Sequence, residues 1–429
     1  MNERGRSRPR TAVVGGGVSG LTAAYVLARS HEVTLYEADD RLGGHAHTHE
    51  LKGTDGEIRS VDSGFIVHND RTYPHLLRLF GELGVATRPT TMSLSVHCEG
   101  CGLEYAGARG PRGLFAQPRA AANLAYLRML AQVPAFHRQA RRLLATPSAG
   151  PEITLARFLR QGRFGAYFTG HFAIPLVASV WSCPPDTALR YPARYLFRFL
   201  AHHGLLSVSG SPNWRTVEGG SARYVELLRE RLGTGAVRVG TPVRAVERTA
   251  EGARITTADG TSTGYDSVVV AVHADQALRL LADPSDAERE ALGAFGYSRN
   301  RTVLHTDASV LPRAAGARGC WNYRLSGCRP QDGHVRVSCY DMNRLQSLDA
   351  PEPYVVTLNA DDRVRPDLVL AEMDYEHPVY TPESVAAQRL LPALSGPVTA
   401  YAGAYHGWGF HEDGCRSGVE AAAALGVRW

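Results

Sequence analysis

The stretch TAVVGGGVSGLTAAYVLARSHEVTLYEADDRLGG, residues 11–44, decides the fold. A short apolar run at 11–14 is typical of a buried strand, and the glycines Gly15, Gly17 and Gly20 follow it in a G-x-G-x-x-G pattern. Apolar residues then recur at helical spacing, and residues 31–37 have the composition of a second strand. This order of strand, glycine turn, helix and strand predicts a β-α-β unit that binds a dinucleotide.

Each glycine of the turn has a steric reason. Gly15 permits a sharp turn, Gly17 permits close approach of the backbone to a pyrophosphate, and Gly20 lets helix and strand pack without a side chain between them. Val18 and Ser19 lie between the last two glycines, at a helix N-terminus whose free N–H groups favour an anion. The turn therefore predicts a phosphate site.

Glu37 is the predicted ribose ligand. It lies 17 residues after Gly20, at the end of the second strand. An acidic side chain there accepts hydrogen bonds from the two ribose hydroxyls of an adenosine and repels a 2′-phosphate, which disfavours NADP.

The residues after Glu37 separate FAD from NAD. Arg41-Leu-Gly43-Gly44 resembles the R-x-G-G loop of the flavin amine oxidase and carotenoid desaturase superfamily, and residues 62–69, DSGFIVHN, resemble its D-x-G return strand. The resemblance implies FAD, with Ala38, Arg41, Gly43 and Gly44 along the pyrophosphate and flavin. Because the fingerprint is intact and no flavin-linking motif is evident, we expect the FAD to be non-covalent.

The later segments extend this resemblance. Residues 215–275 resemble the superfamily's second cofactor-binding segment, which implies that backbone near Val243 meets the adenine. Residues 398–402 form an expected strand, 403–414 a glycine-rich loop and 415–425 a helix. By resemblance this element holds the pyrimidine end of the flavin, where a helix N-terminus stabilises negative charge. The cofactor-binding residues implied here are Gly403, Glu412, Asp413, Gly414 and Cys415.

The predicted fold class is α/β, with a discontinuous Rossmann-like FAD-binding domain (GR2-type) and an α+β substrate domain built on an antiparallel sheet. A chain of 429 residues is too long for one ordinary core. We assign 11–89, 215–275 and 396–429 to the FAD-binding domain and 90–214 and 276–395 to the substrate domain. In the latter we expect strands at 301–305, 334–340 and 354–359, and we interpret residues 1–10 as a disordered tail.

Three further motifs resemble a narrower group, the predicted NAD/FAD-binding oxidoreductases encoded beside cyclopropane fatty acid synthases. The motifs are WRTVEGGS at 214–221, MNRLQ at 342–346 and YHGWGFHEDG at 405–414. This resemblance implies lipid metabolism without specifying the bond that reacts.

Composition and charge describe an ordinary globular protein. Hydrophobic residues make up 44% and charged residues 21%, and the net charge of +5 comes from arginine, because Lys52 is the one lysine. We expect a cytoplasmic protein that binds no nucleic acid. Residues 114–145 predict a basic amphipathic helix, kinked or broken at Pro134, that packs on the substrate domain or docks on an anionic membrane surface.

Two patterns raise the question of a metal. Cys98-Glu-Gly-Cys101 is compatible with zinc binding or redox chemistry, but zinc requires further ligands and no second close pair follows, so we expect a hairpin turn. His45, His47 and His49 alternate, which is compatible with a metal triad, but their position beside the flavin loop favours cofactor packing. We therefore expect no metal site.

Three functional classes remain. The first is an FAD-dependent oxidoreductase acting by hydride transfer on a small hydrophobic substrate, an unsaturated or cyclopropanated acyl or isoprenoid chain. The aromatic block at 164–214 would line its pocket. The second is a flavin amine oxidase, disfavoured because that group uses a substrate-domain lysine and an aromatic residue where this chain has Cys415. The third is a redox-neutral flavin-dependent isomerase. The candidate catalytic residues beside the ring are His45, His47, His406, Trp408 and Cys415.

Overall fold

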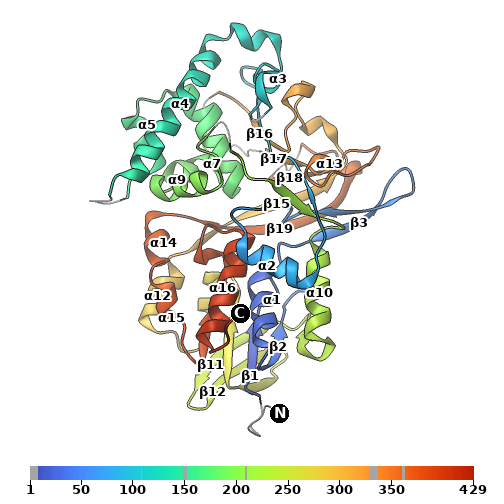
Figure 1. The fold of residues 1–429 in the computed structure, drawn as a ribbon, viewed down its shortest axis with the longest axis vertical. Helices are drawn as coiled ribbons and strands as arrows, with labels where there is room; N and C mark the ends of the chain where they lie inside the picture. The colour runs from blue at the N-terminus through green and yellow to red at the C-terminus, as the bar shows by residue number, and fades with distance from the viewer. Residues whose placement is uncertain (1–7, 108, 148–151, 208–209, 329–336, 360–362) are drawn as a thin grey trace.

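The protein is elongated, with a parallel sheet in one half and a larger mixed sheet in the other (Figure 1). The computed structural model describes residues 8–107, 109–147, 152–207, 210–328, 337–359 and 363–429. In Figure 1 the strands β1 and β2 and both chain termini lie in the lower half, and the helices α3, α4 and α5 lie at the opposite end.

The lower half is built on a five-stranded parallel sheet. Its order is β10 (Val237–Arg238), β2 (Glu32–Tyr36), β1 (Arg10–Val14), β14 (Ser267–Val270) and β20 (Thr399–Tyr401). The central strands are buried continuously rather than in alternation, because helices cover the sheet. The helices packed in this half include α1 (Val18–Leu27), α2 (Pro74–Leu83), α10 (Ala222–Leu232) and α16 (His411–Ala424).

A small antiparallel sheet and several helices complete this half. The sheet consists of β11 (Val243–Thr249), β12 (Gly252–Thr257) and β13 (Ser262–Tyr265). The helices are α11 (Ala274–Leu280), α12 (Asp286–Gly293), α14 (Pro382–Ala387) and α15 (Leu391–Leu394). Parallel and antiparallel sheets with flanking helices confirm the predicted α/β class with a Rossmann-like domain.

The other half is built on a seven-stranded sheet. Its order is β19 (Val369–Val379), β15 (Gly296–His305), β18 (Val355–Leu358), β17 (Val337–Asp341), β16 (Trp321–Leu325), β7 (Leu94–Cys98) and β8 (Glu104–Ala106). All neighbours are antiparallel except β7 and β16, which pair in parallel with Val96 opposite Tyr323. The sheet is therefore mixed rather than purely antiparallel, because β7 and β8 come from an earlier chain segment and extend its edge.

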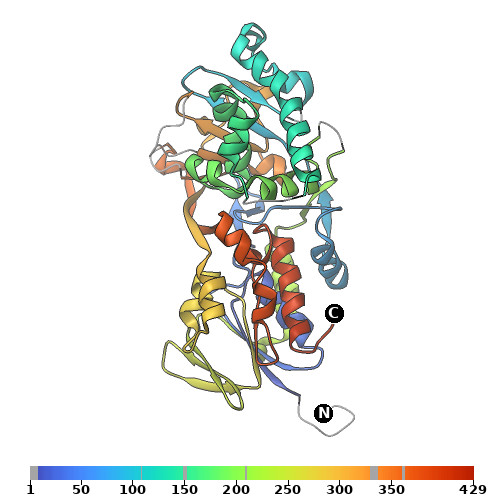
Figure 2. The same cartoon turned by 90° about the vertical axis from the view of Figure 1, so that its left-hand side faces the viewer.

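A group of helices packs beside this sheet, as Figure 2 shows from the side. The helices are α3 (Gly110–Leu114), α4 (Leu124–Ala145), α5 (Leu155–Gln161), α6 (Ala166–Phe168), α7 (Ile174–Trp181), α8 (Pro185–Arg190) and α9 (Ala193–His202). The predicted helix at 114–145 begins later than expected, because the Asn123 side chain caps α4 by accepting from the Tyr126 N–H. Pro134 lies inside α4 without ending it.

Short strands connect the two halves. They are β3 (Thr48–Lys52), β4 (Ile58–Asp62), β5 (Val67–Asn69), β6 (Thr87–Pro89) and β9 (Trp214–Val217), with the short helix α13 (Met342–Leu345) nearby. The continuous strand expected at 62–69 is wrong: β4 ends at Asp62 and β5 starts at Val67, because these strands pair with different partners, β3 and β9.

Two predicted boundaries need correction. Arg10, expected in a disordered tail, pairs with Glu32 as the first residue of β1. The last helix begins at His411 rather than Cys415, because the buried Asp413 carboxylate accepts from the backbone N–H of Phe410 and caps it. Residues 1–7 of the expected tail and 334–336 of an expected strand lie outside the described residues.

Candidate active site

A cavity of ≈ 1370 Å³ runs from the glycine turn of the parallel sheet into the helical half. Of the residues predicted from sequence, the glycine turn, the end of β2 and the R-x-G-G loop line it. These are Gly15, Gly17, Val18, Ser19, Glu37, Ala38, Arg41, Gly43, Gly44 and His45, together with Val243 and Gly403. The cavity is larger than most single-ligand pockets, so it has room for a cofactor and a substrate.

The phosphate turn is shaped by contacts that exclude side chains. A Cβ at Gly20 would lie 1.9 Å from the Gly15 carbonyl oxygen, and a Cβ at Gly15 would lie 2.4 Å from that of Ala271. At Gly17, by contrast, a Cβ would meet nothing within 4 Å. Gly17 is also the N-cap of α1, and no side chain caps that helix. The first N–H groups of α1 are therefore open to an anion in the cavity.

The second glycine loop lies directly against the first. Gly43 donates its N–H to the Gly16 carbonyl at 2.8 Å, and Gly17 and Gly43 form an isolated parallel bridge. Gly43 has φ +108°, in the region that favours glycine. The two loops thus form one backbone cradle, which suits the diphosphate of a dinucleotide.

Glu37 is held at the end of β2 by two backbone groups. Its Oε2 accepts from the Gly16 N–H at 2.6 Å and its Oε1 accepts from the Asp39 N–H at 2.9 Å. Because Glu37 also lines the cavity, its carboxylate lies where a ribose next to the cradle would meet it.

Asp62 joins three sequence motifs at one buried point. Its Oδ1 accepts from Thr48 Oγ1 at 2.6 Å and from both N–H and Oγ of Ser221 at 2.8 Å. Its Oδ2 accepts from Gln346 Nε2 at 3.0 Å. Burial raises the pKa of Asp62 to about 6, while these donors oppose the shift. The D-x-G segment, the VEGGS loop and the MNRLQ helix are therefore fixed relative to one another.

Neutral imidazoles and a tyrosine gather beside the cradle. His45 packs on Tyr375 and His377, with ring centroids 4.8 and 5.2 Å apart. Burial lowers the pKa of His377 to about 4 and lowers that of His45 well below 6.5. His45 Nε2 is buried without a hydrogen-bond partner among the described residues and lines the cavity, as an atom facing a cofactor or substrate would.

Sequence reasoning missed most of this cluster. Tyr375 and His377 lie on β19, and His273 follows β14, where it stacks on Tyr297 at 4.3 Å. All four residues line the cavity. The one sequence signal that could have indicated them is the alternation Tyr375-Glu-His377, which places both rings on one face of a strand, but no strand was predicted at β19.

The three alternating histidines make different contacts, although the rings of His47 and His49 lie 4.1 Å apart. His47 Nδ1 lies 3.0 Å from Tyr375 Oη, whereas His49 Nε2 lies 2.9 Å from Ser63 Oγ. Only His45 lines the cavity, so His47 supports the site through Tyr375 rather than facing it.

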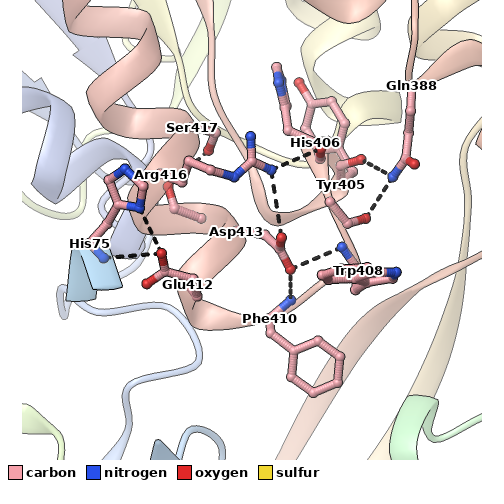
Figure 3. Close-up of polar contacts among 12 residues, drawn as sticks. His75, Gln388, Tyr405, His406, Trp408, Phe410, Glu412, Asp413, Arg416 and Ser417 are labelled. Atoms are coloured by element: carbon pink, nitrogen blue, oxygen red, sulfur yellow. Dashed lines mark hydrogen bonds and ion pairs between the residues drawn. The ribbon is translucent and has the colours of Figure 1, made fainter. Parts of the chain in front are cut away.

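Glu412 and Asp413, which were expected to bind the cofactor, instead bond to backbone N–H groups of the protein (Figure 3). Asp413 accepts from the N–H groups of Trp408 and Phe410 at 2.9 and 3.1 Å, and burial raises its pKa to about 6. Glu412 turns away and accepts from the His75 and Leu76 N–H groups, where it caps α2. Both carboxylates therefore stabilise helix ends and do not line the cavity.

The remaining predicted residues of this segment lie behind the cavity wall. Cys415 is fully buried against Thr22 of α1, and a Cβ at Gly414 would lie 2.6 Å from Val18 Cγ1, so both serve the contact between α1 and α16. His406 and Trp408 are held in the loop; the Trp408 carbonyl accepts from Trp181 Nε1 at 3.0 Å. His47, His406, Trp408 and Cys415, four of the five predicted catalytic residues, are not among the residues that line the cavity. Phe410 and His411 line the cavity in their place.

The fold and the cradle together define an FAD-binding protein with two domains. The flavin containing amine oxidoreductase family matches residues 18–311, and the chain belongs to that family. FAD fits the residues present: an uncapped helix N-terminus, two glycine loops in contact and an acidic residue at the end of β2 would hold it.

Relatives of known name match parts of the chain. AofH of Mycobacterium tuberculosis, named as a flavin-containing monoamine oxidase, is 28% identical over 63% of this chain and 58% of its own length. The carotenoid phi-ring synthase of Streptomyces griseus is 29% identical over 64% of this chain and 54% of its own. The chain thus spans a little over half the length of these curated relatives.

Solved structures share the whole fold. A putrescine oxidase superposes with a TM-score of 0.69 at 17% identity, covering 98% of this chain and 100% of that one. A fatty acid isomerase from P. acnes superposes with a TM-score of 0.67 at 18% identity, covering 96% and 97%. These likenesses show that the fold is shared over nearly the whole chain.

We predict that Glu37→Arg weakens FAD binding without unfolding the protein. The substitution removes a carboxylate that orders the cradle and adds a cation with no partner, which should cost ~2–4 kcal/mol of binding free energy. Flavin release followed by fluorescence during dilution measures the change. Asp40→Arg is the matched control, because Asp40 is exposed, does not line the cavity and undergoes the same charge change. Equal affinities of the two variants would place the ribose elsewhere.

We also predict that acid destabilises the fold through buried histidines. His377 has a folded pKa of about 4, below its ordinary 6.5, so only the unfolded chain takes up its proton between these values. Its contribution is therefore fully present above pH 6.5 and is lost as pH falls towards 4, by ~3 kcal/mol in total. Unfolding free energies measured across this range should show a shallower slope in His377→Asn, whose amide oxygen can still accept from Asn300 Nδ2. Identical slopes would refute the assignment.

Proposed function

We propose that this protein transfers hydride between FAD and a hydrophobic substrate, most directly an unsaturated or cyclopropanated acyl chain or an isoprenoid. The narrower resemblance to oxidoreductases encoded beside cyclopropane fatty acid synthases agrees with a lipid substrate.

The observation that carries the proposal is the wall of the cavity in the helical half. Between residues 92 and 214, the described cavity-lining residues include no Asp, Glu, Lys or Arg. Apolar and aromatic side chains predominate, and we call this part of the cavity the apolar chamber. It is lined by Leu94, Leu130, Val133, Phe172, Leu176, Val180, Trp181, Phe199 and Trp214, with Trp321, Tyr340 and Leu358 from the seven-stranded sheet.

Such a chamber suits a chain of methylene groups. Each buried CH₂ contributes ~0.8 kcal/mol, so an acyl chain binds without a charged anchor, and the length of the chamber would select the substrate. Bound flavin supplies two-electron chemistry by accepting or donating hydride. The protein's own residues position the substrate and exclude water, while the neutral His45 and its neighbour Tyr375 are placed to hold a proton near the cradle.

An amine substrate is the second candidate, favoured by the family and by the monoamine oxidase relative. The cavity-lining carboxylates on β19 would be its anchors, but both have partners: Asp374 pairs with Arg299 at 2.7 Å, and Glu376 lies 3.4 Å from His273. Lys52, the one lysine of the chain, does not line the cavity.

We predict that acyl lipids, and not short amines, reduce the bound flavin. The oxidised enzyme is mixed anaerobically with lipid extract, with short amines or with buffer, and flavin absorbance is followed. Bleaching by amines alone would favour the amine oxidase. Turnover only after the flavin has been reduced would point to a reductase or to a redox-neutral isomerase.

A charge placed in the apolar chamber tests whether the lipid binds there. Leu130→Asp should slow lipid-dependent bleaching about tenfold or more, because an unpaired carboxylate in an apolar wall opposes chain burial. Arg142→Asp lies on the same helix, α4, but is exposed and outside the cavity lining, and should leave the rate nearly unchanged.

We further propose that the α3–α4 region contacts an anionic membrane. Phe115 and Leu124 are 38% and 81% exposed there, whereas Leu114 and Leu130 nearby line the cavity, so this region joins the apolar chamber to the surface. Exposed arginines surround it: Arg112, Arg119, Arg128 and Arg138. No helix in the described part of the chain has the length and apolar character needed to cross a bilayer.

We predict that the protein floats with anionic vesicles at low salt and is released by added salt. Each basic residue near the surface contributes ~1 kcal/mol, which salt screens. Leu124→Asp should reduce flotation several-fold, and Ile58→Asp, at a 68% exposed position in β4, should not. If the wild-type protein does not float with the vesicles, the membrane proposal is wrong and α4 only packs against the rest of the protein.

A further inference from the structure

Three cysteines and a histidine converge at one point outside the cavity. Cys98 and Cys101 flank the turn after β7, His171 lies in the π-helical turn Thr169–Ala173 before α7, and Cys328 follows β16. Their ligand atoms, three Sγ and one Nε2, all lie within 4.8 Å of one another. The C-x-x-C that sequence analysis interpreted as a hairpin turn does form that turn between β7 and β8. The two further groups come from residues 73 and 230 positions along the chain from Cys98.

Two of the distances between these atoms match a tetrahedral metal site. Zinc with bonds of ~2.3 Å to sulfur and ~2.0 Å to nitrogen separates two sulfurs by ~3.8 Å and a sulfur from a nitrogen by ~3.5 Å. Cys98 Sγ and Cys328 Sγ lie 3.8 Å apart, and Cys101 Sγ lies 3.6 Å from His171 Nε2. The sulfur–sulfur distance is far beyond that of a disulfide, and all of these cysteines are free.

The histidine is oriented as a ligand. His171 Nδ1 lies 3.0 Å from the Tyr167 carbonyl, which can only accept, so Nδ1 carries the proton and the Nε2 lone pair faces the sulfurs. The Tyr167 ring stacks on the imidazole at 3.9 Å, and the His171 carbonyl accepts from Tyr105 Oη at 2.7 Å. Fixing one ring nitrogen through a backbone carbonyl is the usual support of a metal-bound histidine.

The cysteine turn is also fixed by its surroundings. Gly102, with φ +69°, donates to the Cys98 carbonyl at 2.8 Å, and its own carbonyl accepts from Arg119 Nη2 at 2.7 Å. A Cβ at Gly100 would lie 2.9 Å from Gly327 Cα, so the turn packs closely on the segment that carries Cys328. The four ligand groups are therefore held together by backbone contacts that do not depend on a metal.

We propose that Cys98, Cys101, His171 and Cys328 bind one zinc ion in a closed structural site. Three thiolates and one imidazole are a zinc ligand set, and four protein ligands leave no open position for catalysis. Binding releases the thiol protons to solvent, so occupancy rises with pH.

The zinc site connects the edge of the seven-stranded sheet to the wall of the apolar chamber. Phe172 and Leu176, which follow His171, line the chamber, and so does Tyr105, which donates to the His171 carbonyl. Zinc would thus fix the position at which α7 meets the substrate, without touching the flavin.

The test is the metal content of the full-length, FAD-loaded protein purified without chelators. Elemental mass spectrometry should find about one zinc per chain. Cys101→Ser and Cys328→Ser should each lower that content at least several-fold. Cys320→Ser is the matched control, because Cys320 is buried outside the cluster and donates to the Thr91 carbonyl, which a hydroxyl can also do. It should retain the metal.

A second measurement uses the wild-type protein, so it does not depend on whether the serine variants fold. Zinc in the wild-type protein is exchanged for Co²⁺, and four-coordinate cobalt with thiolate ligands should give ligand-field absorption to the red of the flavin bands. The proposal is overturned if reduced wild-type protein neither contains zinc nor takes up Zn²⁺ or Co²⁺. It is also overturned if peptide mapping finds a Cys98–Cys328 disulfide in freshly purified protein, if stoichiometric iron occupies the site, or if both serine variants keep full zinc.

Discussion

The contact between two glycine loops is the constraint on which the cofactor site depends. Gly17 bridges Gly43, and the Gly43 N–H donates to the Gly16 carbonyl, so no side chain can separate the segments. This closeness places the N-terminus of α1, the carboxylate of Glu37 and the buried ring of His45 around one concave surface. A Cβ at Gly20 or Gly15 would collide with backbone carbonyl groups of Gly15 or Ala271. Glycine at these two positions therefore also allows α1 to pack closely on the sheet.

Asp62 extends that constraint to the substrate half. Its carboxylate joins Thr48, Ser221 and Gln346, which belong to segments far apart in the chain. The energetic cost of burying the carboxylate is offset by these donors. Because the neighbouring Ser63 and Tyr375 share a hydrogen bond at 2.8 Å, the same region also positions the His45 cluster. These polar contacts thus fix the segments around the cofactor cradle relative to β19 and α13.

The β-α-β unit and its dinucleotide site were predictable from sequence because they follow from local glycine spacing and apolar runs. FAD, Val243 and the R-x-G-G loop were predicted from the resemblance to the flavin amine oxidase superfamily, and Val243 and the loop residues Arg41, Gly43 and Gly44 line the cavity. The predictions for Glu412, Asp413 and Cys415 rested on the same resemblance, and these three side chains do not line the cavity. The grouping of Tyr375 and His377 with His45, and of Cys98 with its partners, was not predicted, because the pairing of β15 with β19 and of β7 with β16 brings distant residues together.

The central claim is that a flavin cradle opens into an uncharged chamber that holds an acyl or isoprenoid chain. It is tested most directly by the molecule that co-purifies in the cavity, extracted from the FAD-loaded protein and identified by mass spectrometry. The account predicts a long-chain lipid, retained by the wild-type protein and depleted in Leu130→Asp. A polar amine or amino acid, retained equally by both proteins, would contradict it.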